Sequence, residues 1–266
     1  MLKDRYNIYQ NVVSRVKEKS IFIILMTIFI SCNSENAGDC FQKAGKIVRE
    51  EVSMPDFSKI TVFENVGLVI KQGEVQKVEI ETGEFLRNDV TAIVEEGRLV
   101  LRNENSCNYV RDYGLTKVYV TSPNVSEIRS STGLLIESDG ILTFPSLNLL
   151  SESFSNPNAD TTDGHFNLEL ENNSVSIVSN GLAYFQLKGS TGRLAVNLAA
   201  GDSRIEAEGL MAERISINHR ASNDVLVNPQ QAINGIIRGT GDVISYNRPS
   251  EVEVEELYRG KLIFKD

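Results

Sequence analysis

The second half of the chain repeats its apolar residues at an interval of 20. Two sets follow this spacing: Phe185, Ile205 and Val225, and Leu187, Ala207 and Val227. Turn-forming residues recur at nearly the same interval, at Gly181, Gly201 and Asn223. A repeat of this length is typical of a solenoid, in which each repeat packs only against its neighbours. We therefore expect an all-β, right-handed parallel β-helix, or β-solenoid, with rungs of about 20 residues.

The rung hypothesis also predicts which outward side chains meet. Stacked strands lie about 4.8 Å apart, so residue i should lie beside residue i+20. This offset brings Arg204 next to Asp224 and Lys188 next to Glu208. Each is a pair of opposite charges, which stabilises neighbouring strands.

Apolar and polar residues alternate in the rest of the chain. In residues 59–72 the apolar side chains fall mainly on even positions, and residues 90–103 read as a hairpin that turns at Glu96-Gly97. Residues 40–52 have the spacing of a short helix. Residues 250–264 alternate valine with glutamate and then turn, which predicts a hairpin-like cap over the last rung.

Gly239 and Gly241 follow an apolar run and resemble the start of a nucleotide-binding loop. Such a loop must lead into a helix whose N-terminus meets the phosphate. Here residues 242–245 read as another strand, and the Asp242 carboxylate would repel a phosphate. We therefore expect the two glycines to turn a corner between rungs, where a positive φ costs glycine little.

The N-terminal residues have the pattern of an export signal. Residues 1–20 carry five basic residues, and residues 21–31 form an apolar run that is too short to span a membrane. Ser31-Cys32 resembles the lipobox of bacterial lipoproteins, although Phe29 departs from it; the alternative is an internal cysteine after an ordinary signal. We assign residues 1–31 to a signal peptide, 32–55 to a tether and N-terminal segment, and 56–266 to the β-solenoid domain.

If Cys32 carries the lipid, the remaining cysteines are Cys40 and Cys107. Two cysteines in an exported chain can pair. A bridge here would stabilise the fold by about 3 to 5 kcal/mol in the chain-entropy model. The alternative is a pair of free thiols.

The charge of the chain argues against nucleic acid as a partner. Residues 32–266 contain 22 basic and 34 acidic residues, and such a surface repels phosphate backbones. The only histidines are His165 and His219, and neither lies near a nucleophile motif, so the sequence predicts no catalytic residues and no cofactor.

One short stretch carries candidate metal ligands. Asp160, Asp163 and His165 are close in the sequence and could hold a cation through hard ligands. The alternative is a turn, because Asp and Gly also serve loop geometry and calcium loops usually supply more carboxylates.

Three functions fit an exported, acidic chain that is poor in helices. A surface adhesin would bind along its strands, a glycan-processing enzyme would need convergent acids in a cleft, and an envelope accessory would bind a protein. The chain has no Trp. Tyr109, Arg111 and Tyr113 could form a small sugar platform or pack a loop.

Residues 222–249 followed by 260–264, together with 40–52 and 111–133, resemble the DUF2807 family of Bacteroidota lipoproteins, named "putative auto-transporter adhesin, head GIN domain". The resemblance covers essentially all of the chain after Cys32. It implies an exported β-solenoid and adhesion without an established activity. We therefore expect a non-catalytic protein that is lipid-anchored in the outer membrane, on the cell surface or the periplasmic face, and that binds a glycan or an envelope protein.

Overall fold

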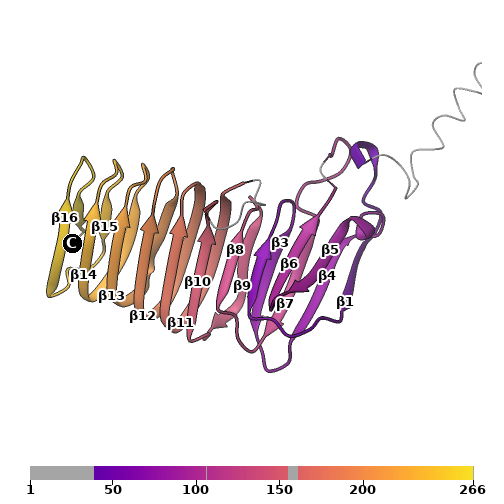
Figure 1. The fold of residues 1–266 in the computed structure, drawn as a ribbon, viewed down its shortest axis with the longest axis horizontal. Coiled ribbons are helices and arrows are strands. Elements are labelled where there is room, and N and C mark those ends of the chain that lie inside the picture. Colours follow the sequence, from indigo (N-terminus) through magenta and orange to yellow (C-terminus); the bar gives the residue numbers. More distant parts are fainter. Residues whose placement is uncertain (1–38, 106, 155–160, 266) are drawn as a thin grey trace, which may run out of the picture.

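The computed structural model describes all residues except 1–38, 106, 155–160 and 266. The body is elongated, and from β8 (Glu127–Ser130) and β9 (Leu135–Leu142) onward the strands succeed one another along its long axis toward the C-terminus (Figure 1). The described part contains no α-helix, only two short 3₁₀ helices, η2 (Asp39–Phe41) and η3 (Arg87–Asp89). None of its helices has the length and the hydrophobicity that crossing a membrane requires.

Seventeen strands form one mixed sheet that curls around a common core. The first nine are β1 (Ile47–Val52), β2 (Lys59–Val62), β3 (Gly67–Gln72), β4 (Lys77–Gly83), β5 (Val90–Glu95), β6 (Arg98–Asn103), β7 (Lys117–Ser122), β8 (Glu127–Ser130) and β9 (Leu135–Leu142). The others are β10 (Ser146–Ser151), β11 (Asp163–Ser179), β12 (Leu182–Leu198), β13 (Arg204–His219), β14 (Val225–Ile237), β15 (Val243–Ser245), β16 (Glu251–Glu256) and β17 (Leu262–Phe264). The all-β prediction is confirmed.

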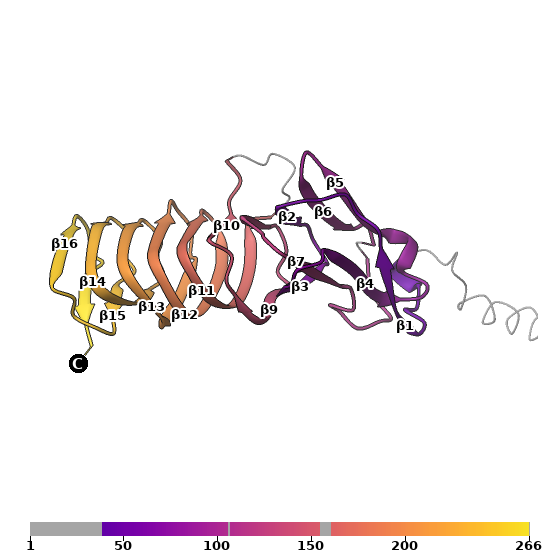
Figure 2. The ribbon, with the colours of Figure 1, turned by 90° about the horizontal axis from the view of Figure 1, so that it is seen from below.

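From β8 and β9 onward the strands stack in parallel in two columns. The first column contains β3, β9, the first halves of β11–β14, β15 and β17. The second column contains β2, β8, β10, the second halves of β11–β14, and β16. Figure 2 shows β11, β12 and β13 bending at mid-length, so that each long strand contributes to both columns.

The predicted register is correct at its centre. Phe185 pairs with Ile205, and Ile205 pairs with Val225, and all three side chains are fully buried. The Phe166 and Phe185 rings stack with their centroids 4.8 Å apart. Alternate residues of both columns point into one apolar cluster, because side chains of a strand alternate between its two sides.

The first part of the chain departs from the expected parallel β-helix. There β1 pairs with β4, β4 with β7, and β5 with β6, all in antiparallel register. The β5–β6 pair is the hairpin expected over residues 90–103. Its turn residues Glu96 and Gly97 both have positive φ.

Two local predictions are wrong. Residues 40–52 do not form a helix: β1 occupies residues 47–52, because alternation lets this stretch pair along β4. The C-terminal residues do not form a hairpin either. Instead β16 extends the second column beside β14, and β17 extends the first column beside β15.

The stacked turns explain the Gly239 and Gly241 pair. Gly241 N donates to Ala221 O at 3.4 Å, and Gly260 N donates to Gly239 O at 3.1 Å. The corner is as expected, but the reason differs, since neither Gly239 nor Gly241 has a positive φ. A Cβ at Gly241 would lie 2.0 Å from Asn223 O, so glycine is needed because adjacent turns approach closely.

Candidate functional site

The outer side of the first column carries a row of aromatic and polar side chains. His165, Tyr184 and Arg204 lie side by side on β11, β12 and β13. The rings of His165 and Tyr184 stack with their centroids 5.3 Å apart. These residues point outward because Phe166, Phe185 and Ile205, which follow them in sequence, fill the core.

The carboxylate of Glu206 organises this row. It accepts hydrogen bonds from the Tyr184 hydroxyl, from Gln186 Nε2 at 3.4 Å, and from Arg204 Nε at 2.8 Å. The hydrogen bonds from Tyr184 and Arg204 lower the pKa of Glu206. Burial and the Glu206 carboxylate raise the pKa of Tyr184. At neutral pH the site therefore holds an ionised Glu206, paired with the Arg204 cation, beside a protonated phenol.

Two hollows adjoin this row. The first, which we call the strand hollow, has a volume of about 310 Å³ and is lined by Asn167, Gln186, Leu187, Lys188, Glu206, Glu208 and Gly209. The second, the bend groove, has about 640 Å³ and lies where the long strands bend. Its lining residues are Glu171, Asn172, Asn173, Ser190, Thr191, Gly192, Met211, Glu213 and Gln230. In β12, Lys188 of the strand hollow lies two residues before Ser190 of the bend groove. Gly209 and Met211 have the same relation in β13, so the two hollows are neighbours along these strands.

The two hollows present amide, hydroxyl, carboxylate and ammonium groups together with one exposed thioether. The Met211 side chain is 53% exposed, and the Lys188 ammonium forms an ion pair with Glu169 at 3.0 Å. The volumes fall within the range of about 300–1,000 Å³ that small ligands occupy. The arrangement can bind a hydroxylated ligand through several hydrogen bonds and one apolar contact.

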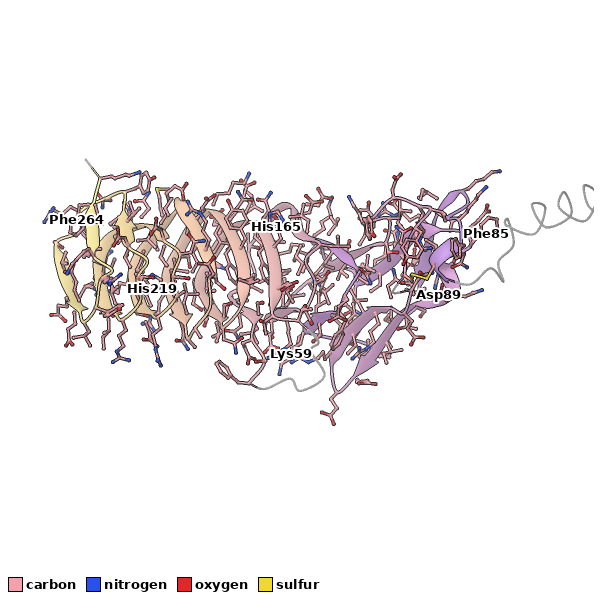
Figure 3. All side chains as sticks on the ribbon, turned by 90° about the horizontal axis from the view of Figure 1, so that it is seen from above. Lys59, Phe85, Asp89, His165, His219 and Phe264 are labelled. Carbon is pink, nitrogen blue, oxygen red and sulfur yellow. A yellow bond between two sulfur atoms is a disulfide. The ribbon has the colours of Figure 1, made fainter. Side chains whose placement is uncertain are left out.

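Only two of the three candidate metal ligands belong to the part of the chain that the structure describes. Asp160 lies outside the described residues, while Asp163 and His165 belong to β11 rather than to a loop. His165 Nε2 lies 3.5 Å from Gln186 Oε1. Within the described ranges no three His, Cys, Asp or Glu side chains come together as metal ligands. His219, at the end of β13, lies on a different strand from His165 (Figure 3).

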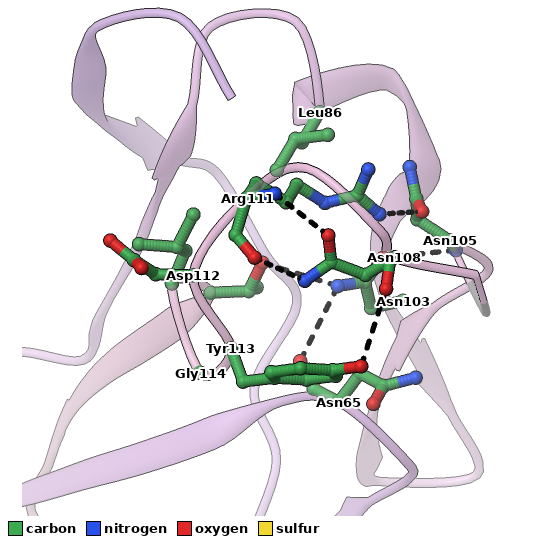
Figure 4. Close-up of a pocket in the computed structure, with 11 residues that line it drawn as sticks. Asn65, Leu86, Asn103, Asn105, Asn108, Arg111, Asp112, Tyr113 and Gly114 are labelled. Atoms are coloured by element: carbon green, nitrogen blue, oxygen red, sulfur yellow. Dashed lines mark hydrogen bonds between the residues drawn. The ribbon is translucent and has the colours of Figure 1, made fainter. Parts of the chain in front are cut away.

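Arg111 holds its loop in place. Its guanidinium donates to Gln42 O at 2.9 Å and to Cys107 O at 2.9 Å. It also donates to Asn105 Oδ1, as Figure 4 shows. The Tyr113 hydroxyl donates to Asn108 O at 3.3 Å. The pocket beside these residues has only about 50 Å³, which is too small for a sugar ring.

Two of the three cysteines pair in one of the two ways that the sequence left open. Cys40 and Cys107 form a disulfide that links η2 to the loop after β6, across a sequence separation of 67 residues. Cys32 lies outside the described residues.

The predicted neighbours are correct for one of the two charge pairs, because Arg204 lies beside Asp224 in the register of β13 and β14. Arg204 forms its ion pair with Glu206 in the same strand, at 2.8 Å, rather than with Asp224. Lys188 faces Gly209 and not Glu208, because a bulge between Gln186 and Lys188 shifts the register. The outward positions 184, 186, 204 and 206 recur at the interval of 20, which was the available signal for the site.

Comparisons with known proteins agree on the fold. A putative adhesin from Bacteroides fragilis superimposes with a TM-score of 0.72 at 17% identity, covering 84% of this chain and 99% of that one. A putative lipid binding protein from Parabacteroides distasonis gives 0.60 at 15% identity, with 84% and 98% covered. A putative adhesin from Parabacteroides merdae gives 0.55 at 16% identity, with 84% and 97% covered.

A sequence comparison with curated proteins gives no match. The family described as "Putative auto-transporter adhesin, head GIN domain", DUF2807, matches residues 56–249, which is most of the chain. The chain belongs to this family.

Proposed function

We propose that this protein is a lipid-anchored binding protein of the outer membrane that recognises a glycan in the strand hollow and the bend groove. The observation that carries the proposal is the pair of adjoining hollows on the outer side of β11–β13. The name of the family and the names of its structural neighbours support a role in binding. The role is non-catalytic.

The chemistry of the lining suits a sugar. Amide and carboxylate side chains present donors and acceptors in fixed directions, which match the hydroxyl groups of a pyranose. The Glu206 carboxylate is already held by three donors, so it keeps its position when a ligand arrives. The exposed Met211 supplies a flexible apolar contact for the face of a ring.

The N-terminal sequence supports the anchor. An apolar run over residues 21–31 is followed by Ser31-Cys32, the pattern in which a bacterial lipoprotein is lipidated on cysteine. The acidic body makes nucleic acid an unsuitable partner. The bilayer and a surface glycan are the partners we propose.

The test is a glycan array probed with the wild-type chain and two double variants. Lys188→Ala with Gln230→Ala removes an exposed cation and an exposed amide from the two hollows. Arg193→Ala with Asn234→Ala removes the same chemistry from the same two strands, β12 and β14, but in the second column. We expect the first pair to weaken glycan binding by tenfold or more, about 1.4 kcal/mol, and the second pair to leave it unchanged.

The results that would contradict the proposal are equally concrete. An equal loss of glycan binding in both double variants would show that the hollows are not the binding site. Capture of one envelope protein without glycan binding would favour an accessory role. Turnover of a bound glycan, lost in Asp160→Asn with Asp163→Asn, would favour the glycan-processing enzyme.

A further inference from the structure

The end of the molecule that contains the disulfide carries a patch of exposed apolar side chains. Phe41 is 60% exposed, Tyr109 76%, Val110 48% and Tyr113 81%. The two tyrosines are the most exposed aromatic residues in the part of the chain that the structure describes. We call these four residues the aromatic end. A cluster of this kind at one end of a soluble body marks an interaction site.

The aromatic end is held rigidly, so its exposure is a property of the fold. The rings of Phe41 and Tyr109 are in contact, with their centroids 5.9 Å apart. The Cys40–Cys107 disulfide joins the two segments, and Tyr109 N donates to Cys40 O at 2.9 Å. Arg111 adds hydrogen bonds from the loop to Gln42 and Asn105. None of these contacts covers the outer faces of the rings.

The place of the aromatic end indicates what covers it. It lies at the end of the body where the described part of the chain begins with η2, opposite the C-terminus (Figure 2). Cys32 precedes Cys40 by eight residues. At about 3.5 Å per residue, even a fully extended segment keeps a lipid on Cys32 within about 28 Å of Cys40. A bilayer that holds this lipid is therefore within reach of the aromatic end.

The charges around the patch favour an uncharged surface over a charged one. Asp112 is exposed between Arg111 and Tyr113, and Lys43 is exposed two residues after Phe41. Arg111 and Glu104 of the same loop likewise carry opposite charges, so the charges around the patch are mixed and do not select a polyanion or a basic partner. Tyrosine combines an apolar ring with a polar hydroxyl, and such side chains lie at the headgroup level of a bilayer.

We propose that the aromatic end rests in the headgroup region of the bilayer to which Cys32 is tethered. This inference builds on the proposed lipid anchor. Contact at this end fixes the orientation of the elongated body, with β16 and β17 directed away from the membrane and the sides of the columns open to a ligand. The partner is a lipid surface, and the contact depends on apolar side chains rather than on charge.

The absence of Trp from the chain makes a direct test possible, because one introduced Trp is a unique fluorophore. Every described strand and the disulfide lie after residue 38, so a chain of residues 32–266 keeps the whole described fold. With Cys40 and Cys107 joined, Cys32 is its one free thiol. A maleimide phospholipid coupled to Cys32 then anchors the chain to phosphatidylcholine vesicles, whether or not cells lipidate it.

Three single-Trp variants are compared on these vesicles: Tyr109→Trp, Tyr113→Trp and the control Tyr258→Trp. Tyr258 is also well exposed, at 56%, but lies near the C-terminal end. We expect brominated phosphatidylcholine to quench Trp at 109 and 113, and iodide in solution to quench them several-fold less than Trp at 258. Added salt should not change this pattern. Val110→Ser with Tyr113→Ser should reduce the lipid quenching of Trp at 109.

Two outcomes would overturn the proposal. Trp at 109 and 113 could be as open to iodide as Trp at 258, with no quenching by brominated lipid. Alternatively, they could be shielded from iodide only at high protein density and without lipid quenching, in which case a second copy covers the patch. The proposed function is tested independently of this inference, by the glycan array and by the mass of the Cys32 peptide in cells.

Discussion

His219 shows how burial changes the chemistry of a single residue. Its side chain is fully buried, and its register neighbours are Leu198 and Ile237. Burial lowers the pKa of the imidazole, while the backbone of Gly241 and the carboxylates of Asp224 and Asp242 oppose this shift without cancelling it. His219 therefore acts as a neutral core residue and is unsuited to act as an accessible base.

A pH dependence of stability follows from His219. In the unfolded chain the imidazole binds a proton near pH 6.5, whereas in the folded chain it resists protonation. As the pH falls below about 6.5, the unfolded state binds more protons, so the free energy of unfolding falls by up to about 1.4 kcal/mol per pH unit. The loss continues until the pH reaches the lowered pKa of the folded state.

The measurement is urea unfolding at about pH 7.5 and about pH 5.5, for wild type and His219→Leu. Leucine suits the site because Leu198 occupies the neighbouring position of the same column. We expect the variant to lose less stability than wild type over this interval. An equal loss in both proteins would show that other groups, and not His219, cause the pH dependence.

At the scale of the elements, the close packing of the turns that connect the columns determines which glycines can be substituted. Gly241 lies where one turn touches the next, and a Cβ there would be 2.0 Å from Asn223 O and 2.9 Å from His219 Nε2. We expect Gly241→Ala to lower the free energy of unfolding by about 1–3 kcal/mol, because the added atom forces the turns apart. Gly241→Val should cost more, since valine adds further atoms to the same contact.

The matched control is Gly133→Ala. Gly133 also lies in a turn and lacks a positive φ, and the nearest atom to its Cβ position, Asp163 Oδ2, is 3.8 Å away. Chemical denaturation should find this variant close to wild type. If Gly241→Ala were as stable as Gly133→Ala, the close approach of the turns would not be the reason for the glycine.

Side-chain alternation and the interval of 20 predicted the strands of the second half and the Phe185, Ile205, Val225 stack. Both patterns arise from burial, because the side chains that face the core recur at regular positions in the sequence. The predicted Lys188–Glu208 pair failed because a bulge after Gln186 shifts the register of Lys188 to Gly209. Arg204 lies in register with Asp224 but forms its ion pair with Glu206 of its own strand. The antiparallel pairing of β1 with β4 joins segments about 30 residues apart, which no local pattern specifies.

The candidate site was harder to predict than the fold. The glutamate in the row, Glu206, lies at an ordinary outward position of a strand, and its three donors come from β12 and from its own strand. Sequence spacing brought Tyr184 beside Arg204 and Gln186 beside Glu206, but the hollows depend on where the long strands bend. Gly189, with a φ of 108°, allows that bend in β12.

At the scale of the whole molecule, a stack of parallel strands ends in an open edge. In the described structure β16 pairs on one side only, with β14. Its residues Glu251, Glu253 and Glu255 are exposed, and Val252 between them is 42% exposed. An unpaired edge of this kind invites a second copy, and charged side chains along it oppose such pairing.

Replacing these glutamates should therefore allow the molecules to associate end to end. Two copies of β16 in antiparallel register would place glutamate opposite glutamate, which is destabilising. We expect Glu251→Gln, Glu253→Gln and Glu255→Gln together to produce dimers, whose fraction rises with protein concentration in sedimentation velocity. Wild type should not associate through this edge under the same conditions.

The control replaces Glu74, Glu96 and Glu104 by glutamine. These residues are exposed outside β16, so the control makes the same change in net charge. If the control associates equally, net charge keeps the copies apart; if neither variant associates, the glutamates do not protect the edge.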